Sequence, residues 1–237
     1  MEDNNIENLP QHIAIIMDGN RRWAKQHNLD TASGHKEGAE NLKRIAKYAN
    51  KIGIKYMTVY AFSTENWKRS EAEVTAIMKL LKYYLHYFLT SDMGNIKVNV
   101  IGKIDKLNPE LQDEIKQIMK KCESNTGMVL NIAFNYGGRD EIITATQKIA
   151  EKVKNNELKV EDINENIFNN YLYTANQPEP DLLIRTSGEQ RISNFLLWQI
   201  AYTEILFVDK YWPEFSNEDL LNAIKNYGNR TRKFGGK

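Results

Sequence analysis

An apolar run joins directly to a carboxylate and three cations in the segment HIAIIMDGNRRWAK, residues 12–25. A tight turn needs only Asp18 and Gly19, so the cations behind them call for another explanation. Guanidinium groups bind phosphate oxygens through paired hydrogen bonds, and Mg²⁺ takes one or two carboxylates together with phosphate oxygens and water. Asp18 is therefore either the first residue of a turn or a metal ligand in a Mg²⁺–diphosphate site. Arg21 and Arg22 beside it favour the metal site.

Three further polar loops follow apolar runs: STENWKR at residues 63–69, NYGGR at 135–139 and RTSGEQR at 185–191. Short apolar runs alternate with longer amphipathic ones along the chain, which is typical of an α/β protein with a mostly parallel sheet. Ligands of such sheets bind outside the carboxyl ends of the strands. The four loops therefore predict one phosphate-binding rim, on which the converging arginines are Arg22, Arg69, Arg185 and Arg191.

The elements that must position this rim can be read from the hydrophobic pattern. The apolar runs predict six strands, at residues 12–17, 55–62, 96–101, 128–135, 181–185 and 204–208. Helical spacing predicts helices through residues 42–49, 70–89, 109–124, 139–153, 161–171, 192–201 and 216–227. No repeat or linker interrupts the chain. We therefore expect a single α/β domain over residues 1–237, with a central six-stranded sheet flanked by helices and a flexible segment at residues 1–11.

Composition excludes several classes of protein. The formal net charge of +1 over 237 residues argues against a nucleic-acid binder. The one cysteine, Cys122, excludes an intrachain disulfide and a Cys-based zinc cluster. The polar N-terminus lacks the basic and apolar regions of a signal peptide, and no apolar run reaches about eighteen residues. We expect a cytoplasmic protein, either free in solution or in peripheral contact with a membrane.

Familiar catalytic motifs are absent from the sequence. There is no G-x-x-x-x-G-K-[ST] loop, no G-x-G-x-x-G after the first strand and no H-E-x-x-H. A G-x-S-x-G elbow is missing, as is the D-D-x-x-D signature of the all-helical trans-prenyl synthases. A diphosphate site in this chain must therefore be built from the rim. The helix expected at residues 70–89 contains LLKYYLHYFL, which indicates either core packing or one wall of a groove for an isoprenoid chain.

Collinear motifs over almost the whole chain identify a family resemblance. They are HIAIIMDGNRRWAK, GHKEGAENL, YAFSTENWKRS, NIAFNYGGRDEI, DLLIRTSGEQRISNFLLWQIAYTEILF and the C-terminal NRTRKFGG. From about His12 to Gly236 the sequence resembles the cis-prenyltransferases, in particular their bacterial undecaprenyl diphosphate synthase branch. The resemblance implies repeated addition of isopentenyl diphosphate to an allylic diphosphate such as farnesyl diphosphate, with cis double bonds and release of diphosphate. It also implies Mg²⁺ dependence, a homodimer, a parallel sheet and a hydrophobic tunnel.

The same resemblance assigns roles to single residues. Asp18 matches the aspartate that holds Mg²⁺ against the allylic diphosphate, and Glu204 matches a second metal-linked carboxylate near the dimer interface. Asn66 matches the proton acceptor, although an amide is a weak base and the diphosphate is the alternative acceptor. Arg185, Arg191 and Ser193 match the isopentenyl diphosphate pocket. Further substrate contacts are implied for Gly19, Asn20, Arg21, Arg22, Trp23, His35, Ser63, Thr64, Glu65, Trp67, Arg69 and Ile192.

One position departs from the family pattern. Relatives carry an arginine in the slot of Thr31, where it helps to bind the allylic diphosphate, whereas this chain reads HNLDTASGH with unchanged spacing. Without this arginine, we expect either a different affinity for the allylic donor or a different allylic donor.

Three functional hypotheses follow. The first is a cis-prenyl chain elongase that makes a long carrier lipid, with which the small Ala61 beside the tunnel mouth agrees. The second is a short-chain or irregular prenyl diphosphate synthase, motivated by Thr31 and by bulky residues of the aromatic helix, namely Tyr83, Tyr84, Tyr87 and Phe88. The third is a non-catalytic partner subunit, which the retained Asp18 and Asn66 argue against.

Overall fold

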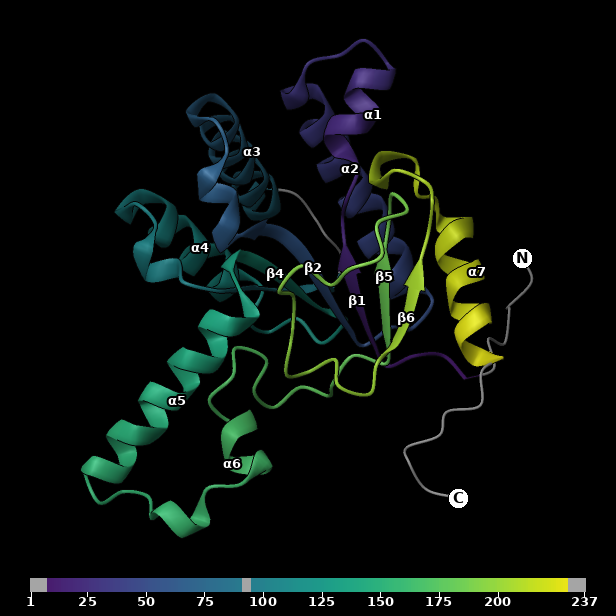
Figure 1. Cartoon of the computed structure of the whole chain (residues 1–237). Helices are drawn as coiled ribbons and strands as arrows, with labels where there is room; N and C mark the ends of the chain where they lie inside the picture. The colour runs from purple at the N-terminus through teal and green to yellow at the C-terminus, as the bar shows by residue number, and fades with distance from the viewer. Residues whose placement is uncertain (1–7, 91–94, 230–237) are drawn as a thin grey trace.

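Six parallel strands form the centre of the protein, whose computed structural model describes residues 8–90 and 95–229 (Figure 1). The strand order is β3-β4-β2-β1-β5-β6. The strands are β1 (His12–Ile16), β2 (Tyr56–Ser63), β3 (Lys97–Ile101), β4 (Val129–Tyr136), β5 (Leu182–Arg185) and β6 (Glu204–Phe207). Each lies within one or two residues of its predicted position. The register aligns Ile16 with Arg185 and with Tyr60, so β1, β2 and β5 end at the same edge of the sheet.

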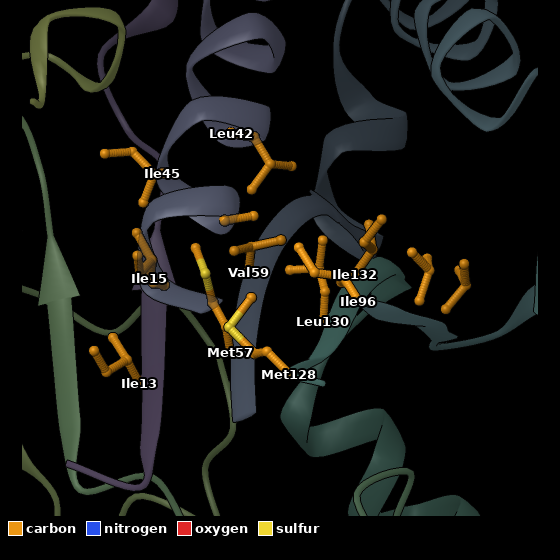
Figure 2. Packing of buried hydrophobic residues seen from close by; sticks show 14 of the residues in the cluster. Ile13, Ile15, Leu42, Ile45, Met57, Val59, Ile96, Met128, Leu130 and Ile132 are labelled. Carbon is orange, nitrogen blue, oxygen red and sulfur yellow. The ribbon is translucent and has the colours of Figure 1, made fainter. Parts of the chain in front are cut away.

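Seven helices occur in the described part of the chain. They are α1 (Asn20–Gln26), α2 (Thr31–Lys51), α3 (Glu71–Thr90), α4 (Pro109–Lys121), α5 (Gly138–Lys154), α6 (Glu165–Asn169) and α7 (Asn217–Gly228). Apolar residues of α2, α3, α4 and α7 pack with alternate residues of the strands in the larger core cluster. Figure 2 shows this packing, in which Leu42 and Ile45 of α2 lie over Ile15 and Val59 of the sheet. The α/β architecture predicted from the alternating pattern is thus confirmed.

The other face of the sheet is covered differently from the prediction. Residues 192–201 were predicted to form a helix, and that prediction is wrong. Ser193, Asn194 and Leu196 have positive φ angles of 50°, 64° and 47°, which break helical hydrogen bonding and produce a series of turns. Phe195 and Leu196 of this turn segment are fully buried against the sheet. The predicted helix at 161–171 is likewise reduced to the single turn α6 after a short 3₁₀ segment, Val160–Asp162.

The chain ends are described in part. Residues 8–11 pack on the domain, because Leu9 contacts the larger core cluster and the Gln11 amide donates to Asp181 Oδ2 at 2.7 Å. The remainder of the predicted flexible segment and the NRTRKFGG motif from residue 230 onward lie outside the described residues. Among the described residues, no helix combines the length and the hydropathy needed to cross a bilayer.

A row of polar side chains crosses the otherwise apolar sheet. Thr58, Asn131 and Asn99 are aligned on three neighbouring strands and bond to one another, and His12 Nε2 lies 2.8 Å from Thr58 Oγ1. His12 Nδ1 donates to the carbonyl of Pro178 at 2.7 Å, so Nε2 of the neutral ring accepts from Thr58. Burial lowers the pKa of His12 to about 4, against weaker opposing effects of Pro178 and Asp181.

This histidine makes folding sensitive to acid. A folded-state pKa below the unfolded value of about 6.5 contributes stability above pH 6.5, and that contribution is lost as pH falls toward 4. We expect the free energy of unfolding to drop by about 2 kcal/mol between pH 7 and pH 5 from His12 alone. Urea unfolding of wild type and His12→Gln at both pH values tests this. An equal pH dependence in the two proteins would contradict it.

Candidate functional site

Asp18 is held at the carboxyl edge of the sheet by groups from the end of β5 and from α1. Its amide donates to Thr186 Oγ1 at 3.0 Å, and the Thr186 hydroxyl donates back to the Asp18 carbonyl at 2.7 Å. Its carboxylate accepts from Arg185 Nη2 at 2.8 Å and lies 3.3 Å from Arg22 Nη2. Burial raises the pKa of Asp18, but the hydrogen bond and charge of Arg185 and the charge of Arg22 outweigh it. The pKa is lowered overall, and the group is ionised at neutral pH.

Arg185 connects Asp18 to the turn segment that follows β5. Its side chain is only 4% exposed. Nη1 donates to Ser193 Oγ at 2.7 Å and to the carbonyl of Arg191, while the buried Nε has no hydrogen-bond partner. A buried guanidinium that depends on one carboxylate is poorly placed to leave its position. Arg185 therefore acts as a fixed positive charge beneath the rim.

The exposed arginines of the rim share one carboxylate that the sequence reasoning missed. Glu189 accepts from Arg22 Nη1 at 2.9 Å and pairs with Arg191. Its partner Arg191 is 60% exposed, and both arginines line the cavity described below. An anion with more charge than a carboxylate could compete for both guanidinium groups. The signal was available, because Glu189 lies inside the RTSGEQR loop.

A cavity of about 990 Å³ opens at this edge of the sheet. Both signs of charge line it, with cations in excess. The lining residues are Met17, Asp18, Gly19, Asn20, Arg21, Arg22, Lys25, Asn28, Leu29, Asp30, Thr31, His35, Arg69, Glu189 and Arg191. The predicted rim is therefore a concavity. Its wall comes more from α1 and the α1–α2 connection than from the loops after β2 and β5, and no lining residue comes from residues 135–139 after β4.

Gly19 allows the chain to turn from β1 into α1. Its φ is +106°, and a Cβ there would lie 2.8 Å from Tyr211 Cδ1 and 3.0 Å from Tyr211 Cα. The segment around Tyr211 is itself fixed to the site, because the Trp212 amide donates to the Asp18 carbonyl at 3.0 Å. The Tyr211 ring also lies 5.7 Å from the guanidinium carbon of Arg22. Tyr211 is thus a further residue of the site that the sequence did not reveal.

Gly19→Ala is expected to impair the site beyond the cost of its backbone strain. Gly53 is a matched control, since its φ is +97° and a Cβ there meets only Leu9 Cδ2 at 3.5 Å. Each substitution should cost about 1–3 kcal/mol of stability in urea unfolding. Only Gly19→Ala should displace Asp18 and Arg22, lowering turnover at this site on the order of 100-fold. Equal turnover in the two variants would contradict the role given to Gly19.

Close packing of α1 on α2 places Asn20 and His35. A Cβ on Gly38 would lie 2.3 Å from Asn20 Oδ1, so the asparagine side chain occupies the space that this glycine leaves. Asn20 Oδ1 is buried and has no hydrogen-bond partner. It is therefore a candidate acceptor for a ligand donor or a water molecule.

A carboxylate on α3 gathers cations at the side of the cavity. Glu73, with a side chain 10% exposed, contacts Arg69 at 2.8 Å and Arg21 at 3.5 Å. His35 Nε2 lies 3.5 Å from Glu73 Oε1. Burial lowers the pKa of His35, although the neighbouring Glu73 opposes the shift. Glu73 thereby ties the loop after β2 to α1 and α2.

The loop of residues 63–69 lies on the rim, but only Arg69 of it lines the cavity. Asn66 Oδ1 accepts from the Ser63 amide at 3.0 Å in a capping box, so its oxygen has a structural partner. Glu65 accepts from Asn194 Nδ2 at 2.9 Å, and Trp67 Nε1 donates to Asn135 at 2.7 Å. These contacts, together with Thr64 beside Gly137, place the loop against the segments after β4 and β5.

Three further predicted site residues lie away from the cavity. Trp23 stacks on His27 one helical turn later, with ring centroids 4.3 Å apart, and so points along α1. Ile192 packs with the second core cluster. Glu204 begins β6 beside Leu182, at the amino end of the sheet. Because each strand residue adds about 3.3 Å, Glu204 lies roughly 16 Å from Asp18 along the strand direction. A single chain therefore does not bring the two carboxylates together.

An apolar pocket of about 100 Å³ adjoins the cavity. Met17, Asn20 and His35 line both spaces. The remaining walls come from α2, α3, β2, β4 and the segment before α7, and they comprise Gly38, Ala39, Leu42, Ala61, Ile77, Leu80, Leu81, Ile132, Phe134 and Trp212. A polar, cationic site thus leads into an apolar one between α2, α3 and the sheet. The long tunnel expected from the sequence stays a prediction.

The rim has too few metal-binding side chains to hold a metal ion unless a bound phosphate supplies further oxygen ligands. Among the described residues, no three His, Cys, Asp or Glu side chains form a metal-binding cluster. Mg²⁺ commonly uses one or two carboxylates and takes its other ligands from phosphate oxygens and water. Asp18, ionised and with a side chain 28% exposed, fits that description.

Comparisons with known proteins agree with this geometry. A family model described as undecaprenyl diphosphate synthase matches residues 16–235. The isoprenyl transferase of Clostridium tetani is 50% identical over 98% of this chain and 91% of its own length. The (2E,6E)-farnesyl-diphosphate-specific ditrans,polycis-undecaprenyl-diphosphate synthase of Micrococcus luteus is 50% identical over 100% and 96%. The crystal structure of lavandulyl diphosphate synthase from Lavandula x intermedia, in complex with dimethylallyl diphosphate, superposes with a TM-score of 0.91. It is 40% identical, over 96% of this chain and 99% of that one.

Proposed function

The chain belongs to the prenyltransferase family of undecaprenyl diphosphate synthases, and we propose that it condenses isopentenyl diphosphate with an allylic diphosphate, farnesyl diphosphate first of all. Each addition forms a cis double bond and releases diphosphate, and the product is a polyprenyl diphosphate such as undecaprenyl diphosphate. The observation that carries this proposal is the junction of a cationic cavity, built around Asp18, with an apolar pocket. A diphosphate headgroup and a prenyl chain need those two environments side by side.

The rim residues suit the charge changes of this reaction. When the allylic carbon–oxygen bond breaks, its electron pair goes to the departing diphosphate, whose negative charge increases. Arg22, released from Glu189, would bind oxygens of the departing diphosphate, and Arg191 would bind those of isopentenyl diphosphate. The buried Arg185 would supply fixed positive charge beneath them. Such preorganised charge stabilises the transition state more than the ground state.

Mg²⁺ is the cofactor we propose for this site. Asp18 would hold it together with diphosphate oxygens, and the ion would neutralise charge on the leaving group. The proton lost after carbon–carbon bond formation then needs an acceptor. Because the Asn66 oxygen accepts from Ser63, we favour the departing diphosphate over Asn66.

A homodimer is part of the proposal. β6 is an edge strand whose Phe207 is 36% exposed, and Ile143 of α5 is 57% exposed. Burying such residues against a second copy would remove apolar surface from water. The metal role predicted for Glu204 requires that second copy, because within one chain Glu204 lies far from Asp18. A monomeric mass by light scattering at micromolar concentration would contradict this. The predicted cytoplasmic location stays a prediction.

Product analysis tests the function directly. The protein is incubated with farnesyl diphosphate, labelled isopentenyl diphosphate and Mg²⁺, and product length is measured. We expect a ladder that converges on long polyprenyl diphosphates. Products that stop after one or two additions would reject the undecaprenyl assignment, and no transfer with any donor would favour the non-catalytic partner subunit.

A second candidate is a short-chain or irregular prenyl diphosphate synthase. It is favoured by Thr31 and by the likeness to lavandulyl diphosphate synthase, whose structure contains dimethylallyl diphosphate. Turnover with dimethylallyl, geranyl and farnesyl diphosphate as the only allylic donor separates the two candidates. Preference for dimethylallyl diphosphate would support the second.

A further inference from the structure

An apolar groove is lined by residues of α2 and α3. Its volume is about 350 Å³, and its described lining contains two lysines but no carboxylate. Lys36 lies on the α2 wall and Lys79 on the α3 wall, and Tyr83, which is 56% exposed, lies at one end. The remaining lining residues are Ala32, Ser33, His35, Ala76 and Leu80.

This groove is separated from the apolar pocket by side chains only. Leu80 of α3 and His35 of α2 line both the inner pocket and the outer groove. His35 also lines the cationic cavity, so three spaces meet at this one residue. No strand lies between the pocket and the groove, and a small separation of α3 from α2 would join them.

The inner pocket is small for a growing chain. A cavity of about 150 Å³ binds one benzene molecule, so a pocket of about 100 Å³ has room for one isoprene unit at most. The space beneath α3 is closed on the other side by the buried β-strand residues Ile132 and Phe134. The remaining walls are α2 and α3, and a movement of α3 away from α2 would open the pocket toward the groove.

The chemistry of the groove fits the surface of an anionic lipid bilayer. Lysine side chains lie with their stems along apolar surface and their ammonium groups toward lipid phosphates. Tyrosine side chains are enriched at the same depth of a membrane, where the ring is apolar and the hydroxyl is hydrated. We infer that the α2–α3 groove is the face with which the protein rests on an anionic membrane, and through which the apolar chain of the product enters the lipid. The part of this inference that concerns the product chain rests on the proposed function.

Vesicle flotation without any substrate tests the membrane face. Wild-type protein should float with vesicles of phosphatidylglycerol and phosphatidylcholine, and not with phosphatidylcholine alone. The double variant Lys36→Gln/Lys79→Gln should lower the partition coefficient about tenfold. Lys116→Gln/Lys120→Gln removes the same charge from exposed positions of α4 and should leave partitioning unchanged. Equal losses in the two pairs, or no flotation of wild type, would overturn the inference.

A single fluorescent label locates the contact. Cys122 is the only cysteine and is buried, so a probe attached to Tyr83→Cys reports on the groove alone. Adding anionic vesicles should shift its emission to the blue, whereas a probe on Lys116→Cys should not respond. A shift at residue 116 and none at residue 83 would place the membrane contact elsewhere.

Kinetics distinguish this inference from the proposed function. In a single turnover without lipid, Lys36→Gln/Lys79→Gln should match wild type, because neither lysine lines the cationic cavity. With anionic vesicles, steady-state turnover should rise several-fold for wild type only. Vesicle binding without any prenyl transfer would reject the proposed function but keep the membrane face. Transfer with normal vesicle stimulation in the double variant would reject the exit route.

Discussion

Asp18→Ala is expected to lower kcat for prenyl transfer about a thousandfold, the largest effect on activity of any single substitution at this rim. The carboxylate holds Arg185 and Arg22 in place and is the proposed Mg²⁺ ligand, so its loss removes both fixed charge and the metal contact. Initial rates at saturating Mg²⁺ and both diphosphates measure the effect.

Asp18→Asn separates charge from shape. The amide retains one oxygen, which can accept either from Arg185, as Oδ2 does now, or from the Gly19 amide, as Oδ1 does at 2.7 Å. If the negative charge and its metal are what matter, Asn should be nearly as inactive as Ala. Activity within about tenfold of wild type in either variant would reject the metal role. Circular dichroism of both variants checks that the rate loss does not come from unfolding.

Removing Asp18 should cost more stability and more activity than removing Arg185, because the two groups differ in burial. Asp18→Ala leaves a guanidinium that is 4% exposed without its carboxylate, which should cost about 3 kcal/mol of unfolding free energy. Arg185→Met leaves Asp18, 28% exposed, which water can solvate. Arg185→Met should therefore cost less than about 1 kcal/mol while lowering transfer about a hundredfold.

The double variant completes this comparison. Asp18→Ala/Arg185→Met contains neither charge, so it should be more stable in urea than Asp18→Ala alone. Arg185→Lys tests the geometry, because lysine keeps the charge but cannot reach Asp18 and Ser193 as the guanidinium does. A double variant less stable than Asp18→Ala would contradict the view that the buried arginine is the costly partner.

Much of the site could be predicted because the apolar runs of the sequence show where the strands end. Residues 13–17 and 182–184 are uninterrupted apolar runs, and parallel pairing places the residues after them side by side. That reasoning correctly brought Asp18 to Arg185. Applied to Glu204 it would also have predicted the separation, because Glu204 begins its strand rather than following it.

Other features depended on the direction in which individual side chains point, and no pattern in the sequence specifies that direction. Trp23 and Arg22 are neighbours, yet one stacks on His27 and the other faces the cavity, because successive helical residues point about 100° apart. The turns at residues 193–196 follow from positive φ angles in an apolar segment that reads as a helix. Glu189 and Tyr211 acquired roles only when folding brought them to Arg22.

The sequence by itself therefore determined the α/β sheet, its carboxyl rim, the family and the residue types available for diphosphate chemistry. The alternation of apolar and amphipathic runs is a local pattern, and it predicts the positions of the strands before any tertiary contact is known. Only the tertiary structure decided which rim residues face the cavity and that Asn66 caps its own loop. It also decided that Asp18 depends on a buried arginine and that the chain pocket is closed off by α3. The dependence of Asp18 on Arg185 shows the physical reason, because it arises from a contact between residues 167 positions apart that no local pattern specifies.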